Sequence, residues 1–337
     1  MSQKHTKSPC CQGKTIRFGQ RRRQCSICKK TWRIRQKRKG RKAKRMNTDI
    51  VKRYLCKNGF NLDEHASRIG ITVPALRKRI RKNLNLLLET EQWTEPPKNK
   101  DLVVVIDALL QQIFFGKDKK CYTVYLVLLR ALDDNEAIIL KPVIFPRYEN
   151  KLDWERALNN IPKSARNRIL ALIGDGKPCY ITIAKDNNWL LQRCHFHLLA
   201  ELNRYASKKR KSKNRELISK IDKEVRIIIT TTDKNKLQES LKKILLFTNN
   251  PNVPQRIKTR FLKGLLRNYE YYRTYLNYPE LNLPITTNSC EALNSIIGNF
   301  LMRIRGINSP SAFRKLVQAL MLLRKRVACK GSNHQPN

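Results

Sequence analysis

Apolar and polar positions are arranged differently in successive stretches of this chain, and each arrangement predicts a different kind of element. Over residues 46–95, apolar side chains recur every three or four positions, the spacing of short helices that bury one face. Over residues 100–199, β-branched and other apolar residues form short unbroken runs, which are typical of strands in a buried sheet. Helical spacing returns over residues 200–284, apart from a strand-like run at 225–232.

The sheet-forming stretch predicts an α/β domain with a mixed sheet. We expect strands over residues 102–107, 121–129, 137–145, 169–174 and 190–197, and helices over residues 151–160 and 178–187. Short polar connections join the first three strands, which predicts an antiparallel meander. Helices separate the later strands, and that alternation is typical of a mixed α/β sheet.

The stretch before the sheet predicts a helix-turn-helix. Asn47 or Thr48 is placed to cap a first helix, and Asn61 stands three residues before Glu64, the spacing of a capping box. Thr72 is placed to cap a third helix, and a proline follows in its first turn, where no backbone N–H is needed. Three short helices in a row are therefore expected.

The third of these helices carries a row of basic residues on its polar side. We predict that four of them contact DNA: Arg77, Lys78, Arg79 and Arg81. A basic helix that follows such a turn has the arrangement of a recognition helix in the major groove. The alternative is a three-helix packing unit whose basic face is only solvated.

The net charge of the chain narrows the range of possible functions. The 337 residues include 71 Lys or Arg and 26 Asp or Glu, a net charge of +45, and residues 1–45 carry 18 basic residues and no acidic one. Such a field attracts a polyanion, and nucleic acid is the first candidate, with a solubilising arm or an RNA-binding protein as alternatives. The apolar share of 41% excludes a wholly disordered basic tail, and no apolar run is long enough to predict a membrane span.

Four cysteines in the basic front segment predict a zinc ribbon. Cys25 and Cys28 have the spacing of a metal knuckle, and Cys10 and Cys11 stand about fourteen residues earlier. Four thiolates suit one tetrahedral Zn²⁺, which would hold together a segment too short and too polar to have a core. The first knuckle is irregular, so Cys10 or His5 must supply a ligand, and the alternative is a ribbon without metal.

Two aspartates at the ends of predicted strands are candidate metal ligands. Asp107 ends the 102–107 run, and Asp175 follows the 169–174 run. If the two strands are neighbours, both carboxylates lie at adjacent points of the sheet. A divalent cation relieves the repulsion between them, and oxygen ligands select Mg²⁺ or Mn²⁺. Taken singly, each aspartate is better explained as a turn or cap residue.

A third carboxylate, Glu291, opens a predicted helix late in the chain. Asn288 and Glu291 have capping-box spacing, so one interpretation of the glutamate is structural. The helix also places Glu291, Asn294 and Gly298 on one stripe of small and polar side chains. A phosphate backbone can approach closely beside such a stripe, which favours a functional interpretation.

These acids and two short motifs together resemble a known family. The Gln-Arg-Cys-His-Phe-His sequence that ends at His197 follows Asp107 and Asp175, and the Thr-Thr-Asn-Ser-Cys-Glu sequence ends at Glu291. In this order they resemble the catalytic core of Mutator-type bacterial insertion-sequence transposases, over roughly residues 100–328. The resemblance implies a ribonuclease H-like fold with an all-helical insertion before the glutamate.

The same resemblance implies roles for individual residues. Asp107, Asp175 and Glu291 match the DDE triad, which implies that they hold two Mg²⁺ (or Mn²⁺) ions. Cys194 and His197 match a motif that supports the active site, although buried packing explains them equally well. The sequence departs from the family at Ala292, where a glycine commonly follows the glutamate.

The expected domain organisation follows. It comprises a basic zinc-ribbon-like segment over residues 1–45, a helix-turn-helix DNA-binding domain over 46–95, the first part of the catalytic core over 100–199, a helical insertion over 200–284, and the C-terminal core helices with the glutamate over 285–328.

The resemblance implies a DNA transposase that binds the terminal inverted repeats of an insertion sequence and performs metal-dependent phosphodiester cleavage and strand transfer. Its partners would be double-stranded DNA, at the transposon ends and the target, and a second copy of the chain, because two ends must meet. With no apolar signal segment and ten scattered cysteines, we expect the reducing bacterial cytoplasm, at the nucleoid, and no membrane. The alternatives are a non-catalytic, transposase-derived DNA-binding regulator and a ribonuclease H-like nuclease.

Overall fold

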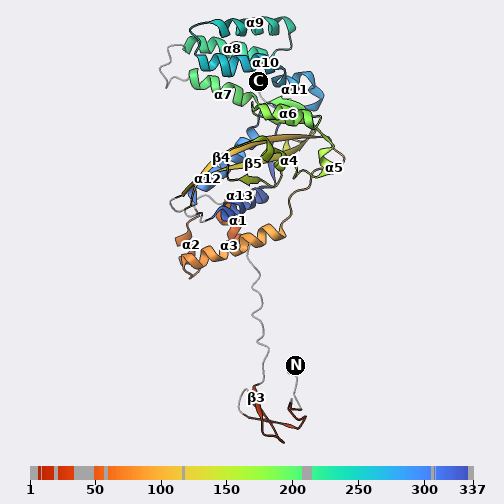
Figure 1. The fold of residues 1–337 in the computed structure, drawn as a ribbon, viewed down its shortest axis with the longest axis vertical. Coiled ribbons are helices and arrows are strands. Elements are labelled where there is room, and N and C mark those ends of the chain that lie inside the picture. Colours follow the sequence, from red (N-terminus) through yellow and green to blue (C-terminus); the bar gives the residue numbers. More distant parts are fainter. Residues whose placement is uncertain are drawn as a thin grey trace. The chain divides into compact units, whose positions relative to one another are not determined.

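The computed structural model describes residues 7–8, 10–18, 22–33, 49–56, 60–115, 118–206, 215–304, 307 and 309–332. The chain forms two compact units, residues 1–47 and 48–337, and each is described by itself (Figure 1). The predicted cap at Asn47 or Thr48 and the alternative zinc ligand His5 lie outside the described residues.

The first unit is a small antiparallel sheet. Its strands are β1 (Thr15–Arg17), β2 (Arg22–Cys25) and β3 (Thr31–Arg33), in the order β1-β2-β3. Among the described residues of this unit, the buried side chains are those of Ser8 and Cys25. A segment that buries so little apolar surface needs a cross-link or a metal to stay folded.

The second unit begins with three helices. They are α1 (Asp49–Cys56), α2 (Leu62–Arg68) and α3 (Val73–Thr90). Both predicted caps are confirmed: Oδ1 of Asn61 accepts from the backbone N–H of Asp63 over 2.9 Å, and Oγ1 of Thr72 accepts from that of Ala75 over 3.4 Å. Gly70 has a φ of +64° between α2 and α3, a left-handed conformation that glycine adopts without strain.

A mixed sheet follows, as the sequence predicts. Its strands are β4 (Leu102–Phe115), β5 (Asp118–Ala131), β6 (Glu136–Ile139), β7 (Val143–Phe145), β8 (Ile169–Gly174), β9 (Leu190–Arg193) and β10 (Arg326–Ala328). The order is β10-β6-β5-β4-β8-β9, and β7 also pairs with β5. The meander from β4 to β6 is antiparallel, whereas β4, β8 and β9 are parallel to one another.

Several predicted boundaries are wrong. The 137–145 strand is two strands, β6 and β7, separated at Leu140–Pro142, because a proline cannot donate to the sheet ladder. The 190–197 strand ends at Arg193, and a helix begins at His195. The strand-like run at 225–232 lies mostly in a helix whose apolar residues face a helical core, so tertiary packing overrides the β-branched composition.

Both faces of the sheet are buried. The predicted helices are confirmed as α4 (Lys151–Leu158) and α6 (Pro178–Asp186), with a short α5 (Lys163–Arg166) between them. Val104 and Ile106 of β4 pack in one cluster with α4 and α6. Val103 and Val105 point to the opposite face and pack with α1, α3 and two C-terminal helices, α12 (Asn288–Arg303) and α13 (Pro310–Arg324).

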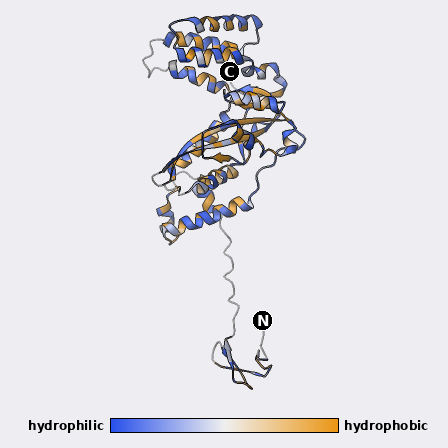
Figure 2. Cartoon of the chain, viewed as in Figure 1, coloured by the Kyte–Doolittle hydropathy of each residue, from blue (hydrophilic) through white to orange (hydrophobic). Residues whose placement is uncertain are grey.

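The stretch between β9 and α12 is helical in its described residues and has its own core. Its elements are α7 (His195–Ala206), α8 (Arg215–Thr230), α9 (Lys234–Asn249), a π-helical turn (Ile257–Leu262), α10 (Lys263–Asn268), a 3₁₀ turn (Tyr269–Tyr272), α11 (Thr274–Asn277) and a second 3₁₀ turn (Pro279–Leu281). Helices carry both hydrophobic and hydrophilic residues, as expected when one side is buried (Figure 2). In the part of the chain that the structure describes, every helix is too short or too polar to cross a bilayer.

The docking of α3 onto the sheet domain is testable. Leu87 is fully buried in the core that α3 shares with the sheet, α12 and α13. We expect Leu87→Ala to lower the free energy of unfolding by about 2–5 kcal/mol, because it leaves a cavity in that shared core. Urea denaturation of the full chain measures the loss. Glu89→Ala, at an exposed position of the same helix, is the control, and a loss for Leu87→Ala no larger than for this control would contradict the shared core.

Candidate functional site

Four cysteine sulfurs of the first unit lie close together. The Sγ atoms of Cys10 and Cys28 are 3.1 Å apart, and so are those of Cys11 and Cys25. All four atoms lie within 4.8 Å of one another. Thiolates around a tetrahedral Zn²⁺ are separated by about 3.8 Å, given Zn–S distances of ~2.3 Å. The cluster has the size and the donors of a zinc site, and Cys10 fills the position that the irregular knuckle left open.

Hydrogen bonds prepare part of this cluster for a metal. The Ser8 hydroxyl donates to Sγ of Cys25 over 3.2 Å, and this bond, followed by one with Cys11, lowers the pKa of Cys25 to about 5. At Cys28 a backbone bond involving Lys30 lowers the pKa, but the neighbouring sulfurs outweigh it and raise the pKa to about 12. Crowded thiolates oppose one another's ionisation, and a dication removes that opposition.

In the second unit, adjacent parallel strands bring two aspartates to one level of the sheet. Strands β4 and β8 are neighbours, which meets the condition that the sequence left open, and Val105 pairs with Ile173. Two residues further along each chain stand Asp107 and Asp175. The prediction that Asp107 ends its strand is wrong, because β4 continues to Phe115 in its long hairpin with β5. Asp175 does follow the end of β8.

Helix α12 places two polar side chains against Asp107. Nδ2 of Asn294 donates to Oδ2 of Asp107 over 2.8 Å, and both side chains are buried. Glu291, one turn earlier on the helix, has a carboxylate oxygen within 4.8 Å of one of Asp107. The capping-box interpretation is wrong, because Thr287 is the N-cap residue and Asn288 is already helical.

A short series of contacts leads from Thr287 to Glu291. The backbone N–H of Thr287 donates to Sγ of Cys194 over 3.3 Å, and the same sulfur lies 3.3 Å from Nδ1 of His197. Nε2 of His197 lies 3.1 Å from Oε1 of Glu291. The contact with Cys194, followed by that with Glu291, raises the pKa of His197 to about 10, so the ring is an imidazolium at neutral pH. In turn it lowers the pKa of Glu291.

The surroundings of Asp107 favour a cation. Burial, followed by the charge of Glu291, raises the pKa of Asp107 to about 7, and Asp175 adds to the rise. Oδ1 of Asn294 is buried beside this carboxylate without a hydrogen-bond partner. Repelling carboxylates and a spare amide oxygen are oxygen donors of the kind that a hard divalent ion prefers, so these residues fit Mg²⁺ or Mn²⁺.

The group of possible ligands differs from the predicted triad. Among the described residues, ligand atoms of Asp107, His197 and Glu291 lie within 4.8 Å of one another, and Asp175 lies outside this group. The structure therefore brings two of the three predicted acids together and adds His197. Asp175 remains close enough that its charge affects Asp107.

Cationic side chains flank Asp175. Its Oδ1 accepts from the backbone N–H of Lys177 over 3.0 Å, and the Lys177 ammonium is paired with Glu149. Burial raises the pKa of Asp175, an effect that the positive charge of Arg193 opposes. The buried guanidinium of Arg193 lies over the ring of Tyr272, 5.7 Å from its centre. Fixed positive charge beside the acids suits a phosphate-bearing substrate.

The four predicted DNA contacts are all exposed on α3: Arg77, Lys78, Arg79 and Arg81. DNA contact by them stays a prediction. Sequence reasoning missed the two contacts made by Asn294 and Thr287. The i, i+3 spacing of Glu291 and Asn294 was an available signal for the first. Nothing in the sequence indicated the second, which joins residues 93 positions apart.

Comparisons with known proteins give only weak likenesses. One solved structure, titled "Drosophila P element transposase strand transfer complex", has 11% identity and a TM-score of 0.44, and the match covers 82% of this chain and 92% of that one. Another, "Crystal structure of NurA with manganese", has 9% identity and a TM-score of 0.13 over 82% of this chain and 62% of that one. At these TM-scores neither likeness defines the fold or the activity of this chain. No protein-family model and no curated protein matches it.

The sulfur cluster predicts zinc in the purified protein. We expect one zinc ion per wild-type chain and its loss in Cys25→Ser, because a serine hydroxyl does not replace a thiolate ligand. Metal analysis of the full chain by mass spectrometry measures both. Cys56→Ser, which changes an exposed cysteine of α1 outside the cluster, should keep its zinc. Wild-type protein that takes up no zinc under reducing conditions would contradict the assignment.

Because Asp107 is buried, replacing it with a neutral residue should stabilise the fold by an amount that depends on pH. The folded pKa of Asp107, about 7, lies above its unfolded value of about 3.9, so ionisation costs stability as pH rises between them. Asp107→Asn removes this cost. In EDTA we expect its gain in Tm to grow between pH 4 and 7 and then level off, and the corresponding gain in the free energy of unfolding has an upper bound of roughly 4 kcal/mol.

The matched control is Asp101→Asn, at an exposed acid next to the start of the same strand. It should leave Tm nearly unchanged at every pH. At pH 8, Mg²⁺ should raise the Tm of wild type more than that of Asp107→Asn. A variant that is less stable than wild type at pH 8 in EDTA would show that the carboxylate is not under electrostatic stress.

Proposed function

We propose that the protein is a metal-dependent DNA transposase of the Mutator type with a ribonuclease H-like core. The observation that carries the proposal is the meeting of Asp107 and Glu291, 184 residues apart in the sequence, with Asp175 nearby, just after the end of the neighbouring strand. Two acids on adjacent parallel strands and a third on a late helix form the arrangement that the family resemblance implies. A net charge of +45 supports nucleic acid as the substrate.

The three acids would hold divalent metal. When bound between Asp107, Glu291 and Asp175, Mg²⁺ or Mn²⁺ would supply Lewis acidity for an oxygen nucleophile and for the charge on the phosphorus centre. The protein's own contribution is placement. Asn294 fixes the orientation of Asp107 through its amide N–H, and His197 fixes Glu291 through its imidazolium.

The same acids serve cleavage and joining, because both are in-line displacements at a phosphodiester. Water is the nucleophile in the first reaction, which frees a 3′-OH at the end of the mobile element. That 3′-OH is the nucleophile in the second reaction, which joins the end to target DNA. Arg193 adds positive charge near Asp175, which would favour a phosphate there.

The biological setting follows from this chemistry. The substrate is the terminal inverted repeat of a bacterial insertion sequence, and the reaction takes place at the nucleoid in the cytoplasm. Two transposon ends must be held together, so the active form is a homodimer with DNA. The front unit and the helices α1–α3 would supply binding to the repeats, since they carry exposed basic side chains.

Removing one acid should separate cutting from binding. We expect Asp175→Asn to lower cleavage of DNA carrying the inverted repeats that flank the gene, on the order of a thousandfold. DNA affinity should stay within about twofold, because a single half-buried acid contributes little to the sequence-independent attraction of phosphates. Gel assays of cut and joined products and fluorescence anisotropy measure the two effects. Asp101→Asn should match wild type in both.

The rival functions give different products. Wild type that binds the repeats but cuts nothing with Mg²⁺ or Mn²⁺ would be a DNA-binding regulator. Wild type that cuts and never joins ends to target DNA would be a ribonuclease H-like nuclease. Equal cleavage by Asp175→Asn and wild type would refute the role of this aspartate.

A further inference from the structure

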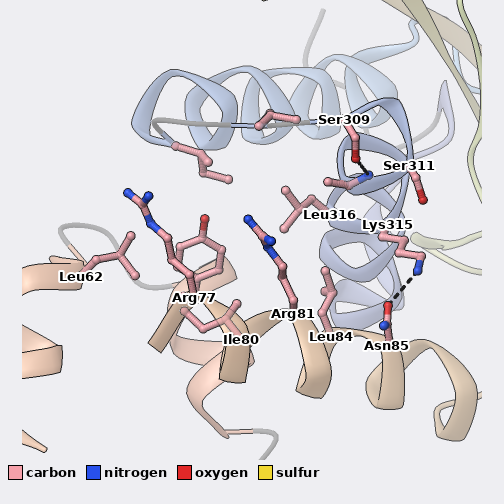
Figure 3. Close-up of a pocket in the computed structure, with 14 residues that line it drawn as sticks. Leu62, Arg77, Ile80, Arg81, Leu84, Asn85, Ser309, Ser311, Lys315 and Leu316 are labelled. Carbon is pink, nitrogen blue, oxygen red and sulfur yellow. Dashed lines mark hydrogen bonds between the residues drawn. The ribbon is translucent and has the colours of Figure 1, made fainter. Parts of the chain in front are cut away.

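A groove lies between α3 and α13, on the face of the sheet that carries α12. It encloses about 260 Å³, and its side chains come from α1, α2, α3, α13 and the segment that follows α12. Figure 3 shows Arg77 and Arg81 of α3 and Lys315 of α13 extending into the space between these helices. None of the metal-site residues lines it. The groove is therefore a feature separate from the carboxylate site.

The charged side chains that line the groove are all positive. Its lining residues include three cations, Arg77, Arg81 and Lys315, and no aspartate or glutamate. The two arginines are one helical turn apart, so their guanidinium groups lie on the same side of α3. Nζ of Lys315 donates to Oδ1 of Asn85 over 2.9 Å, which positions this third charge from the opposite wall. Three like charges held in one groove create a site for an anion with several charges.

The floor of the groove is apolar and belongs to the core. Leu84 and Leu316 take part in the large cluster that α3 and α13 share with the sheet, and Ile80 packs against α2. Ser309 caps α13 by accepting from the backbone N–H of Ala312 over 3.2 Å, which fixes where this wall begins. The cations thus belong to helices that packing holds in place, so the backbone of α3 and α13 needs little rearrangement when a ligand binds.

We propose that this groove seats the sugar–phosphate backbone of duplex DNA, with Arg77, Arg81 and Lys315 on the phosphates and the apolar floor against the sugars. The inference rests on the proposed function and refines it. It also changes the role predicted for α3, because Arg77 and Arg81 then read no bases. Lys78 and Arg79 do not line the groove, and they remain for contacts elsewhere on the duplex.

Helix α12 sets the distance between the groove and the metal site. Glu291 lies in its first turn, and Ile304, which lines the groove, is the residue at its C-terminal end. Thirteen residues of α-helix span about 20 Å. The proposal places the duplex axis along α12. With successive phosphates of one strand about 3.4 Å apart along that axis, the seated phosphates then lie about six nucleotides from the scissile one.

The first experiment measures the salt dependence of binding. Arg77→Gln/Lys315→Gln removes two groove charges, and we expect the slope of log Kd against log salt to become shallower by about 1 to 2 on any duplex sequence. Lys163→Gln/Lys185→Gln is the matched control, because it removes two exposed charges of α5 and α6, on the opposite face of the sheet. The control should keep the wild-type slope.

The second experiment locates the contact. Duplexes carrying one neutral methylphosphonate, moved nucleotide by nucleotide from the cleavage position, should bind wild type more weakly when the substitution lies about six nucleotides away. The groove variant should be insensitive to the same substitution, since its partner charges are gone. Arg77→Gln/Arg81→Gln serves as a second groove variant and should behave in the same way. Thermal unfolding of each variant checks that the fold is intact.

The outcomes separate this inference from the proposed function. The groove does not bind DNA if both folded groove variants keep the wild-type salt slope. The same conclusion follows if the control variant loses as much of the slope as they do. Weaker binding of an acidic peptide by the groove variants, with an unchanged DNA slope, also overturns it in favour of a protein partner. A shallower slope in protein that never cuts DNA supports the groove and refutes the transposase. A groove variant that binds DNA with wild-type affinity and still cuts it refutes the groove and supports the transposase.

Discussion

A carboxylate buried in the middle of a strand is the constraint on which this site depends. Asp107 lies inside β4, where burial and the neighbouring acids raise its pKa to about 7, a shift that corresponds to roughly 4 kcal/mol. Apolar packing of α12 opposes that cost. Leu293, Ile297 and Phe300 are fully buried beneath this helix, and each contributes about 1.5–3 kcal/mol. The packing term is the larger one, so hydrophobic contact holds like charges together.

Electrostatic balance then explains why the site suits a dication. If all three acids are ionised and His197 is an imidazolium, two negative charges remain among them. One divalent ion balances those charges without protonating any acid. The contacts from Thr287 through Cys194 to His197 keep the imidazolium next to Glu291, so that the metal-free site is partly neutralised from within. The predicted supporting role of Cys194 and His197 thus has a physical basis in this geometry, although it stays a prediction.

Local chemistry was predictable from the sequence where it depends on neighbours along the chain. The caps Asn61 and Thr72 and the strand over 169–174 followed from short patterns, whereas the sequence left open whether the strands that carry Asp107 and Asp175 are neighbours. The length of β4 did not follow, because its second half is mixed in polarity and is fixed by pairing with β5.

Contacts between residues far apart in the sequence could not be predicted either. The bond between Asn294 and Asp107 joins residues 187 positions apart, and the run at 225–232 has strand composition but a helical environment. In both cases the deciding partner lies far away in the sequence. The sequence pattern reports which side of an element is apolar, but not which other element covers it.

Under the proposed function, the shared core also determines how the DNA-binding and catalytic parts would act together. α1, α3, α12 and α13 bury side chains in one cluster with the sheet, so α3 cannot move relative to Glu291 without opening that cluster. A DNA-binding domain joined by a flexible linker would only raise the local concentration of DNA at the active site. In the proposed arrangement the groove that holds the arginines of α3 adjoins one end of α12 and Glu291 lies near the other end, so a phosphate in the groove has a defined distance to the acids. Positional accuracy of this kind is what an in-line displacement requires, since small displacements of the reacting groups carry large losses in rate.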